Sequence, residues 1–405
     1  MAQVTTVPCS SMVPGRGGGT LHSDGTRVVA FGGSDRSGEV FSDMYVLGPS
    51  VTVVAPPTAP PALAGHAAAA LCVGWGWVPS AGGGGWVASG GARGAALFGG
   101  INYKEDAALA GLYELRGDAW RALVGEVAPR GVPPSARTGH TLSAVPPPLL
   151  RQPSADGGGG AAVVPLRSVL GGDPAEAAAV LFGGSSPDEG PKNDLFLLRA
   201  TEAGPAAAAC SGWRYDWHAP ATRGAPPAPR ELHAAFVLPA VCELVEGGGG
   251  GGGSGAPGPA SLVRVLRPPA LVVHGGRCED GAPRPDLCVL DLAALAWAPQ
   301  VRSPHTLCAA AAAAEPSGEA LLLLGGLTPA GLSGDLLRLD ARGGGLNGAA
   351  WEWATVPLAR TVKPRFAAAA AAVAGEGAGG GVTLYAWAGM EASEDLSEAL
   401  RIRLP

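Results

Sequence analysis

Short apolar segments that end in a pair of glycines recur along the chain. The clearest is Ala95-Ala96-Leu97-Phe98-Gly99-Gly100. Runs of four to six apolar, β-prone residues bounded by glycine and polar residues are typical of buried strands, and they are too short for helices. Further copies end at Gly33, Gly184, Gly276, Gly326 and Gly389, the last with Ala388 in place of the first glycine. The pattern predicts six equivalent strands, spaced unevenly along the chain.

Three other elements recur around each glycine pair. An acidic residue leads a second apolar run shortly after most pairs, at Asp43, Asp194, Asp286, Asp335 and Glu398, whereas the second copy has Gly111 there. A tryptophan segment then follows in most copies, at Trp120, Trp213, Trp297 and Trp351. A segment of small residues precedes each pair. Four strands repeated six times predict an all-β fold, a six-bladed β-propeller of four-stranded blades.

The small-residue segments are rich in alanine. Ala309–Ala314 and Ala367–Ala372 would be assigned to helix by propensity alone. The repeat nevertheless places them in strand positions, and small side chains fit the crowded axis of a propeller. We therefore predict that these segments form the innermost strands.

We expect one domain over residues 1–405. The predicted blades cover residues 16–60, 63–130, 137–222, 230–300, 302–358 and 365–405, with residues 3–7 as the outer strand of the last blade. This pairing of residues 3–7 with residues 398–402 would remove an open sheet edge. Glycine-rich inserts at residues 73–93, 145–176 and 239–267 lie between first and second strands, so we expect them to be flexible and to project from one face.

These motifs together resemble the kelch repeat. The resemblance rests on Phe-Gly-Gly, on runs such as Asp43-Met44-Tyr45, on the tryptophans and on Arg137-Thr138-Gly139-His140, and it covers nearly the whole chain. Departures are Leu63 in place of an arginine, Ala388, and the lack of a tryptophan in the first and last units. The resemblance implies a kelch-type propeller of the galactose-oxidase-like superfamily, in which loops around the channel mouth often hold a partner.

Charge and cysteine usage limit the classes of partner and compartment. The formal net charge is −6 and only 15% of residues are charged, which argues against nucleic acid or an acidic membrane surface as partner. No leader segment and no apolar run long enough for a membrane span is evident. Seven cysteines without regular spacing suit a reducing compartment. We expect a cytoplasmic protein, with the nucleus as an alternative, that is monomeric on its own.

The glycine pairs and the histidines invite two chemical readings that we consider structural. A phosphate-binding loop needs a glycine turn that leads into a helix, which is missing here. The histidines could be imagined as a ring of metal ligands, but no carboxylates or cysteines converge on them, so no metal is expected. The residues assigned structural roles are Gly32, Gly33, Gly99, Gly100, Gly183, Gly184, Gly275, Gly276, Gly325, Gly326, His66, His140, His233 and His305.

A set of arginines is the candidate binding site. Their guanidinium groups would suit the capture of carboxylates, so the expected partner is a protein or peptide, with an acidic segment as one option. The alternative is that each arginine pairs with an acidic strand start and locks blades together. The set comprises Arg16, Arg137, Arg230, Arg277, Arg302 and Arg365.

Enzymatic activity is less well supported by the residues. Copper-radical oxidases of this fold need two tyrosines and two histidines on one metal, whereas Tyr45, Tyr113, Tyr215 and Tyr385 stand at packing positions of strands. The Glu-x-x-x-Asp-x-x-x-His loop of iron-binding specifier proteins is absent. We expect a non-catalytic interaction scaffold without cofactor or catalytic residues. The alternatives are an oxidoreductase or specifier-like enzyme at the channel mouth, or the propeller of a larger multi-domain enzyme or ubiquitin-ligase adaptor.

Overall fold

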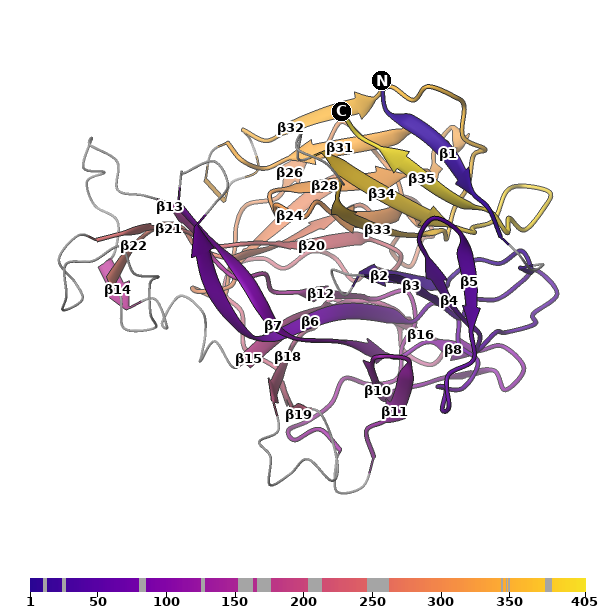
Figure 1. The fold of residues 1–405 in the computed structure, drawn as a ribbon, viewed down its shortest axis with the longest axis horizontal. Coiled ribbons are helices and arrows are strands. Elements are labelled where there is room, and N and C mark those ends of the chain that lie inside the picture. The colour runs from indigo at the N-terminus through magenta and orange to yellow at the C-terminus, as the bar shows by residue number, and fades with distance from the viewer. Residues whose placement is uncertain are drawn as a thin grey trace.

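The computed structural model of the chain is all-β (Figure 1). It describes residues 1–405 apart from 10–12, 24–26, 80–84, 125–127, 152–162, 166–175, 203–212, 246–261, 344, 347, 349 and 376–380. The described residues contain strands and turns but no helix, and therefore no helix that is long and apolar enough to cross a membrane.

Six groups of four antiparallel strands, here called units 1 to 6, make up the body of the described chain. Their strands, from first to fourth, are as follows: unit 1, β2 (Thr20–Ser23), β3 (Val28–Phe31), β4 (Met44–Leu47) and β5 (Val51–Val54); unit 2, β6 (Ala67–Pro79), β7 (Gly85–Phe98), β10 (Leu112–Arg116) and β11 (Ala119–Ala122); unit 3, β12 (Thr141–Ala144), β15 (Glu176–Phe182), β18 (Leu195–Glu202) and β19 (Trp213–His218); unit 4, β20 (Ala234–Leu238), β23 (Ala270–His274), β24 (Asp286–Asp291) and β25 (Ala296–Trp297); unit 5, β27 (Ala311–Ala314), β28 (Ala320–Leu324), β31 (Leu336–Asp340) and β32 (Glu352–Val356); unit 6, β33 (Ala369–Ala374), β34 (Val382–Trp387), β35 (Ala399–Arg403) and β1 (Gln3–Val7).

The alanine-rich segments are strands, as predicted. β27 pairs with β28 from Ala311 opposite Leu324 to Ala314 opposite Leu321, and β33 pairs with β34 in the same way. Pairing with a long-range partner strand outweighs the helical preference of alanine, because propensity is a weak local term.

The predicted pairing between the two ends of the chain is confirmed. β1 runs antiparallel to β35, from Gln3 opposite Arg403 to Val7 opposite Ala399. Figure 1 shows these two strands side by side, with both chain ends close together. Val4 and Val7 of β1 are buried, whereas Thr5 and Thr6 between them are exposed. Residues three apart in a strand point to opposite faces, and the two valines accordingly join two different apolar clusters.

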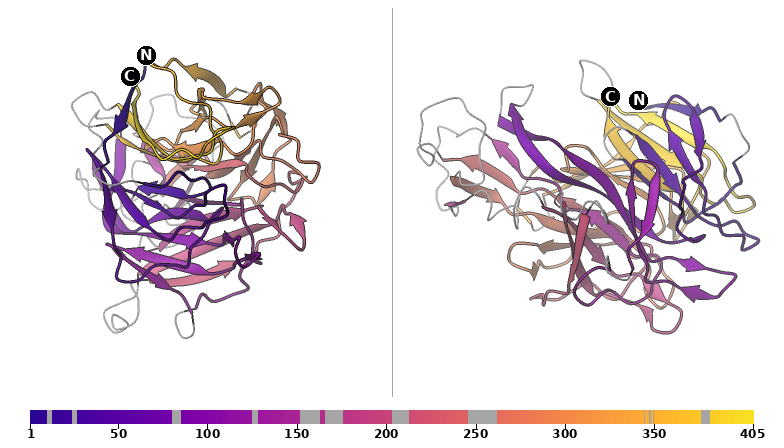
Figure 2. Two further views of the ribbon diagram at one scale, coloured as in Figure 1. Left: turned by 90° about the vertical axis from the view of Figure 1, so that its right-hand side faces the viewer. Right: turned by 60° about the horizontal axis from the view of Figure 1, so that its bottom comes forward.

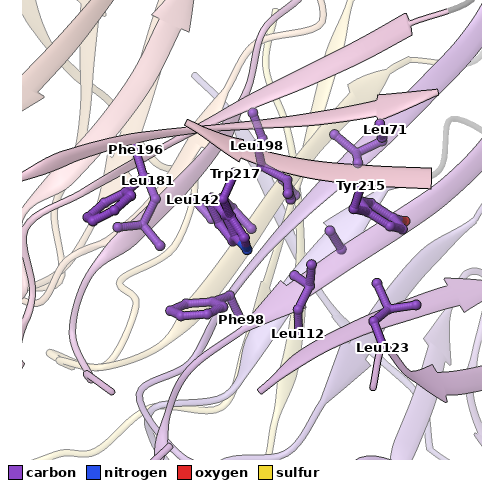
Figure 3. Close-up of a cluster of buried hydrophobic side chains, with 14 of the residues drawn as sticks. Leu71, Phe98, Leu112, Leu123, Leu142, Leu181, Phe196, Leu198, Tyr215 and Trp217 are labelled. Carbon is purple, nitrogen blue, oxygen red and sulfur yellow. The ribbon is translucent and has the colours of Figure 1, made fainter. Parts of the chain in front are cut away.

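Buried apolar side chains lie between successive units. One cluster joins units 2 and 3 and includes Phe98, Leu142 and Trp217 (Figure 3). Equivalent clusters join units 1 and 2, 3 and 4, 4 and 5, and 5 and 6. Another joins unit 6 to unit 1, where the ring centroids of Trp387 and Tyr45 lie 5.7 Å apart. The colours of the chain accordingly pass around the molecule in the left view of Figure 2.

The first strands of the units meet at a ring of backbone hydrogen bonds. One residue just before each first strand donates its N–H to the carbonyl of its counterpart in the preceding unit, at 2.7 to 2.9 Å, and the series returns to its starting residue. All six have positive φ, between 52° and 69°. These ring residues are Gly18, Gly65, Gly139, Leu232, Ala309 and Ala367.

The three inserts form strands where the structure describes them, which corrects the expectation that they are flexible throughout. The long hairpin of β6 and β7 takes up most of residues 73–93. The distal end of β7 pairs with β13 (Leu149–Arg151), and this sheet continues through β21 (Val241–Leu244) and β22 (Leu262–Arg267) to β14 (Val163–Pro165). Long-range pairing of this kind cannot be read from glycine content. Most of the glycine runs themselves lie outside the described residues.

The strands from the inserts, here called the insert sheet, project from one side of the body. Figure 1 shows β13, β14, β21 and β22 on the left, far from β8 (Ile101–Asn102) and β16 (Ser185–Ser186) on the right. β8 and β16 begin directly after glycine pairs, so the loops that follow these pairs face away from the insert sheet. The predicted projection of the inserts from one face thus agrees with the positions of their strands.

Candidate functional site

Four arginines of the candidate site are buried inside their own units. Arg16, Arg137, Arg230 and Arg365 are at most 1% exposed. Each bonds the acidic residue that begins the third strand of the same unit, as Arg137 Nη2 does with Asp194 Oδ2 at 2.8 Å. The equivalent partners are Asp43, Asp286 and Glu398.

Each of these guanidinium groups also binds main-chain carbonyls. Nη1 of Arg137 donates to Gly183 O at 3.0 Å, and its Nε donates to Ser135 O at 3.0 Å. Arg16, Arg230 and Arg365 make the matching pair of bonds. One side chain thereby ties together the start of the first strand, the end of the second and the start of the third.

This geometry corrects the hypothesis that the four arginines contact a partner, because a fully buried guanidinium cannot reach one. It also revises the alternative: the ion pairs close strands within a unit and do not join neighbouring units. The pKa of Asp286 shows the strength of the arrangement. Burial raises this pKa, but the hydrogen bond and positive charge of Arg230 outweigh burial and bring it below the ordinary value.

Arg302 does not belong to the repeated position. In every unit the residue opening the first strand accepts a hydrogen bond from the second glycine of the preceding unit, and in unit 5 that residue is Leu307, bound by Gly276 N at 3.0 Å. Arg302 lies five residues upstream in a short strand, β26 (Val301–Arg302), where it is opposite Asp286 and exposed. The sequence motif Arg302-x-x-His305 was therefore assigned in the wrong register.

The histidines pack between units. His66, His140 and His233 each meet the phenylalanine of the preceding Phe-Gly-Gly edge to face, with ring centroids 5.4 to 5.6 Å apart. Nε2 of His66 lies 3.0 Å from Oγ1 of Thr20, and Nε2 of His233 lies 2.9 Å from Oγ1 of Thr141. Burial lowers the pKa of His66 and of His233 to about 3, so both rings are neutral at physiological pH.

The other three junctions between units lack this phenylalanine–histidine pair and have different residues at the two positions. Unit 6 ends its second strand with Trp387, and the corresponding residue of unit 1 is Gly19, where a Cβ would lie 2.8 Å from the indole ring. Ala310 and Ala368 take the place of histidine in units 5 and 6. His305 instead packs against Trp353, with ring centroids 5.0 Å apart. Phenylalanine and histidine thus occur together because they fill one space.

The tight bend after each second strand needs two residues with positive φ, which explains the glycine pairs. Both residues of each pair have positive φ, for example 70° at Gly99 and 102° at Gly100. A Cβ on Gly99 would lie 2.7 Å from Arg137 O. Ala388, the exception to the pattern, has a φ of 60° and is the only alanine among these positions.

The surface that remains available is the face formed by the loops after the glycine pairs, here called the loop face. Each loop starts next to the ring, because the residue before each ring residue forms a β-bridge with the first loop residue, as Thr138 does with Ser185 and Glu231 with Arg277. The six loops comprise residues 34–42, 101–110, 185–193, 277–285, 327–334 and 390–397.

These loops hold an uneven share of the charge. Eleven of the 34 acidic residues of the chain lie in them, but only five of the 28 basic residues do. The loops therefore carry a formal charge of −6, which equals the net charge of the whole chain. Outside the loops, acidic and basic residues balance.

All five basic residues of the loops are engaged in ion pairs. Arg36 reaches from unit 1 to Asp395 of unit 6 at 2.9 Å, and Lys104 reaches from unit 2 to Glu39 of unit 1 at 2.6 Å. The other three pairs are Lys192 with Glu189, Arg277 with Glu231, and Arg284 with Asp280. Arg277 is the one loop residue of the predicted arginine set, and its side chain is 40% exposed.

Several acidic residues of the loop face have no such partner. Glu105, Asp106, Asp188 and Glu279 are exposed and form no ion pair within the described part of the chain. Tyr103, which lies in the same loop as Glu105 and Asp106, has half of its surface exposed. Its pKa is raised by partial burial and by the nearby carboxylate of Glu231. The sequence contains this charge pattern, but the predicted site was chosen from recurring arginines and missed it.

Among the described residues, no group of three or more histidines, cysteines and carboxylates is arranged to hold a metal ion. Comparisons with known proteins do not add an assignment: no protein-family model matches the chain, and no curated protein matches it.

Proposed function

We propose that the chain is a closed six-bladed propeller of the kelch type that serves as a protein-interaction scaffold. Units 1 to 6 would be its blades. Support for closure comes from the ring hydrogen bonds, from the apolar cluster between units 6 and 1, and from the hydrogen bond of Gly389 N to Arg16 O, which repeats between the last and first units the bond made between all others.

The loop face is the proposed binding surface, and its charge is the observation that carries the proposal. The net negative charge of the chain lies in four of the six loops around one end of the ring, residues 34–42, 101–110, 185–193 and 390–397. Concentrated charge of one sign speeds the encounter with a partner of opposite sign and disfavours partners of like sign. A basic segment of a partner protein therefore suits this surface better than the acidic segment expected from the arginines.

Exposed Tyr103 adds a recognition element for such a segment. The face of a tyrosine ring attracts lysine and arginine side chains, and the neighbouring carboxylates provide ion-pair partners. Tyr103 is 51% exposed, so its ring is accessible to a partner.

The test compares two matched double variants in affinity purification followed by mass spectrometry. Glu105→Gln with Asp188→Asn reduces the formal charge of the loop face from −6 to −4, and Asp118→Asn with Glu352→Gln neutralises two exposed carboxylates elsewhere. We expect the first variant to lose proteins that the wild type and the control retain, and we expect raised salt to weaken the same interactions. Recovery of one set of proteins by all three forms would contradict the proposal.

A further inference from the structure

The connections that lead into units 3 and 4 share a proline-rich sequence and are here called the unit-3 strap and the unit-4 strap. Residues 130–137 read Arg-Gly-Val-Pro-Pro-Ser-Ala-Arg, and residues 223–230 read Arg-Gly-Ala-Pro-Pro-Ala-Pro-Arg. Main-chain bonds tie the first residue of each strap to the fourth strand of its unit, as Trp297 N donates to Arg223 O at 2.9 Å. The last residue is the buried arginine of the unit, so both ends of each strap are held.

Burial along the unit-4 strap follows a period of three residues. Pro227 and Arg230 are buried, whereas the other residues of 223–229 are exposed. Residues 225–228 belong to neither a helix nor a strand. Proline fixes φ near about −65° and disfavours helical backbone in the residue before it. A polyproline II helix repeats every three residues, so this pattern indicates that the strap packs one edge on the body and presents the other two.

The two exposed edges carry the same dipeptide twice. Ala225-Pro226 and Ala228-Pro229 are three residues apart, which places them one after the other along the same pair of edges. Grooves lined with aromatic rings, such as those of SH3 domains, bind segments with prolines at this spacing. The buried edge, with Pro227, does not have to enter such a groove.

A basic residue precedes the two dipeptides. Arg223 is exposed and stands three residues before Pro226, so the strap reads Arg-x-x-Pro-x-x-Pro. Nη2 of Arg223 donates to Ala294 O at 3.0 Å, which holds the side chain at the surface. A guanidinium at this place suits an acidic pocket beside the aromatic groove, because it can bind a carboxylate through two hydrogen bonds.

The unit-3 strap has the same burial pattern but lacks the second dipeptide. Pro134 and Arg137 are buried there, whereas Pro133 is exposed. Ala136 takes the place of Pro229, so one exposed dipeptide that ends in proline remains. The chain therefore contains a matched control for the unit-4 strap.

We infer that residues 223–229 of the unit-4 strap bind an SH3-type domain of a partner protein, with a groove of aromatic rings and an acidic pocket. The held ends and the prolines fix the segment before binding, which lowers the entropic cost of complex formation. This inference goes beyond the proposed role of the loop face. Asn193 at the end of one loop donates to Pro227 O at 2.9 Å, but the strap has its own residues and calls for a partner of different chemistry.

The test is a calorimetric titration of the full chain with purified SH3 domains that prefer Arg-x-x-Pro-x-x-Pro peptides. We expect the wild type to bind one domain per chain. Pro229→Ala, which gives the unit-4 strap the residue found in the unit-3 strap, should weaken binding about tenfold or more, and so should Arg223→Glu. Pro133→Ala is the control and should bind like the wild type.

Ala136→Pro completes the motif in the unit-3 strap and should raise the ratio from one to two domains per chain. A gain of binding cannot come from misfolding, and thermal melts check the folding of the other variants. Failure of the wild type to bind any of these domains, or wild-type affinity in Pro229→Ala, would overturn the inference. Neither result would bear on the loop face, because Glu105→Gln with Asp188→Asn leaves the strap unchanged.

Discussion

At the scale of the residue, buried arginine side chains connect separate segments of the chain through hydrogen bonds and ion pairs. The arginines that open units 1, 3, 4 and 6 each join three segments of one unit. In unit 2, Leu63 replaces the arginine and Gly111 replaces the acid, so both members of the pair are absent together. A lone buried charge costs several kcal/mol, whereas an apolar residue in its place is tolerated.

Substitution of one of these arginines should therefore affect stability first. We expect Arg137→Ala to lower the free energy of unfolding by about 1–3 kcal/mol, because two carbonyls and Asp194 lose their donor. The exposed Arg302 supplies the control, and Arg302→Ala should change stability by less than about 0.5 kcal/mol. Denaturant titration of both variants measures the difference. Equal stabilities would show that the bonds of the Arg137 side chain contribute nothing.

The histidine interactions predict a stabilising substitution. His66 and His233 each bond a threonine hydroxyl of the preceding unit, but His140 faces Ala67 at the equivalent position. Ala67→Thr should raise the free energy of unfolding by about 0.5–1.5 kcal/mol, the usual net value of one hydrogen bond.

Ala234 is the matched control for this substitution, because the residue it faces in unit 5 is Ala310 and not a histidine. Ala234→Thr would bury a hydroxyl without a ring nitrogen to bond, so no gain is expected. Thermal melts of the two variants give the comparison. A gain of the same size at both positions would attribute the effect to threonine itself.

At the scale of the element, the bends before the first strands are limited by backbone conformation. Gly65 is a ring residue with a φ of 63°, and a Cβ there would lie 1.9 Å from Oγ1 of Thr138. Gly38 has a φ of 84°, but its Cβ would meet nothing within 4 Å. The two glycines therefore share the conformational strain and differ in the available space.

This difference can be measured with Gly65→Ala and Gly38→Ala. Each substitution should lower the free energy of unfolding by about 1–2 kcal/mol, because alanine disfavours the left-handed conformation. Gly65→Ala should lower the free energy of unfolding by about 1–3 kcal/mol more, because the added methyl group overpacks the site. Chemical denaturation is the measurement. If the Gly38 variant proved as unstable as the Gly65 variant, crowding at the ring would not be the cause.

At the scale of the whole molecule, several separate contacts join the N-terminal part of the chain to its C-terminal part. They are the pairing of β1 with β35, the apolar cluster with Tyr45 and Trp387, and the bonds of Arg36 to the loop that holds Asp395. Each of them connects segments that are more than 300 residues apart in sequence. Their combined contribution should determine how cooperatively the chain unfolds.

The contribution of β1 can be tested by truncation and by a point variant. Removal of residues 1–10 should lower the melting temperature sharply and promote association, because it exposes the edge of β35 and the contacts of Ala2, Val4 and Val7. Val4→Asp should destabilise the full chain in the same direction, whereas Thr5→Asp, at an exposed position of the same strand, should not. An unchanged melting curve for both the truncation and Val4→Asp would argue against this role.

The sequence alone determined the features that depend on local repetition. The glycine pairs, the acidic strand starts and the alanine-rich segments indicated six four-stranded units, and the spacing near residues 3–7 indicated the pairing of the two ends. All of these rest on short-range patterns, since strand alternation and tight bends leave their mark on neighbouring residues.

Only the tertiary structure decided what those patterns contact. A sequence shows that an arginine recurs, but burial and long-range geometry determine whether it meets Asp194 within its own unit or a partner outside. The register of Arg302, the pairing of inserts into one sheet and the gathering of acidic loops on one face likewise depend on residues brought together from distant parts of the chain. Such contacts are set by the packing of whole units against one another, and local sequence carries no record of it.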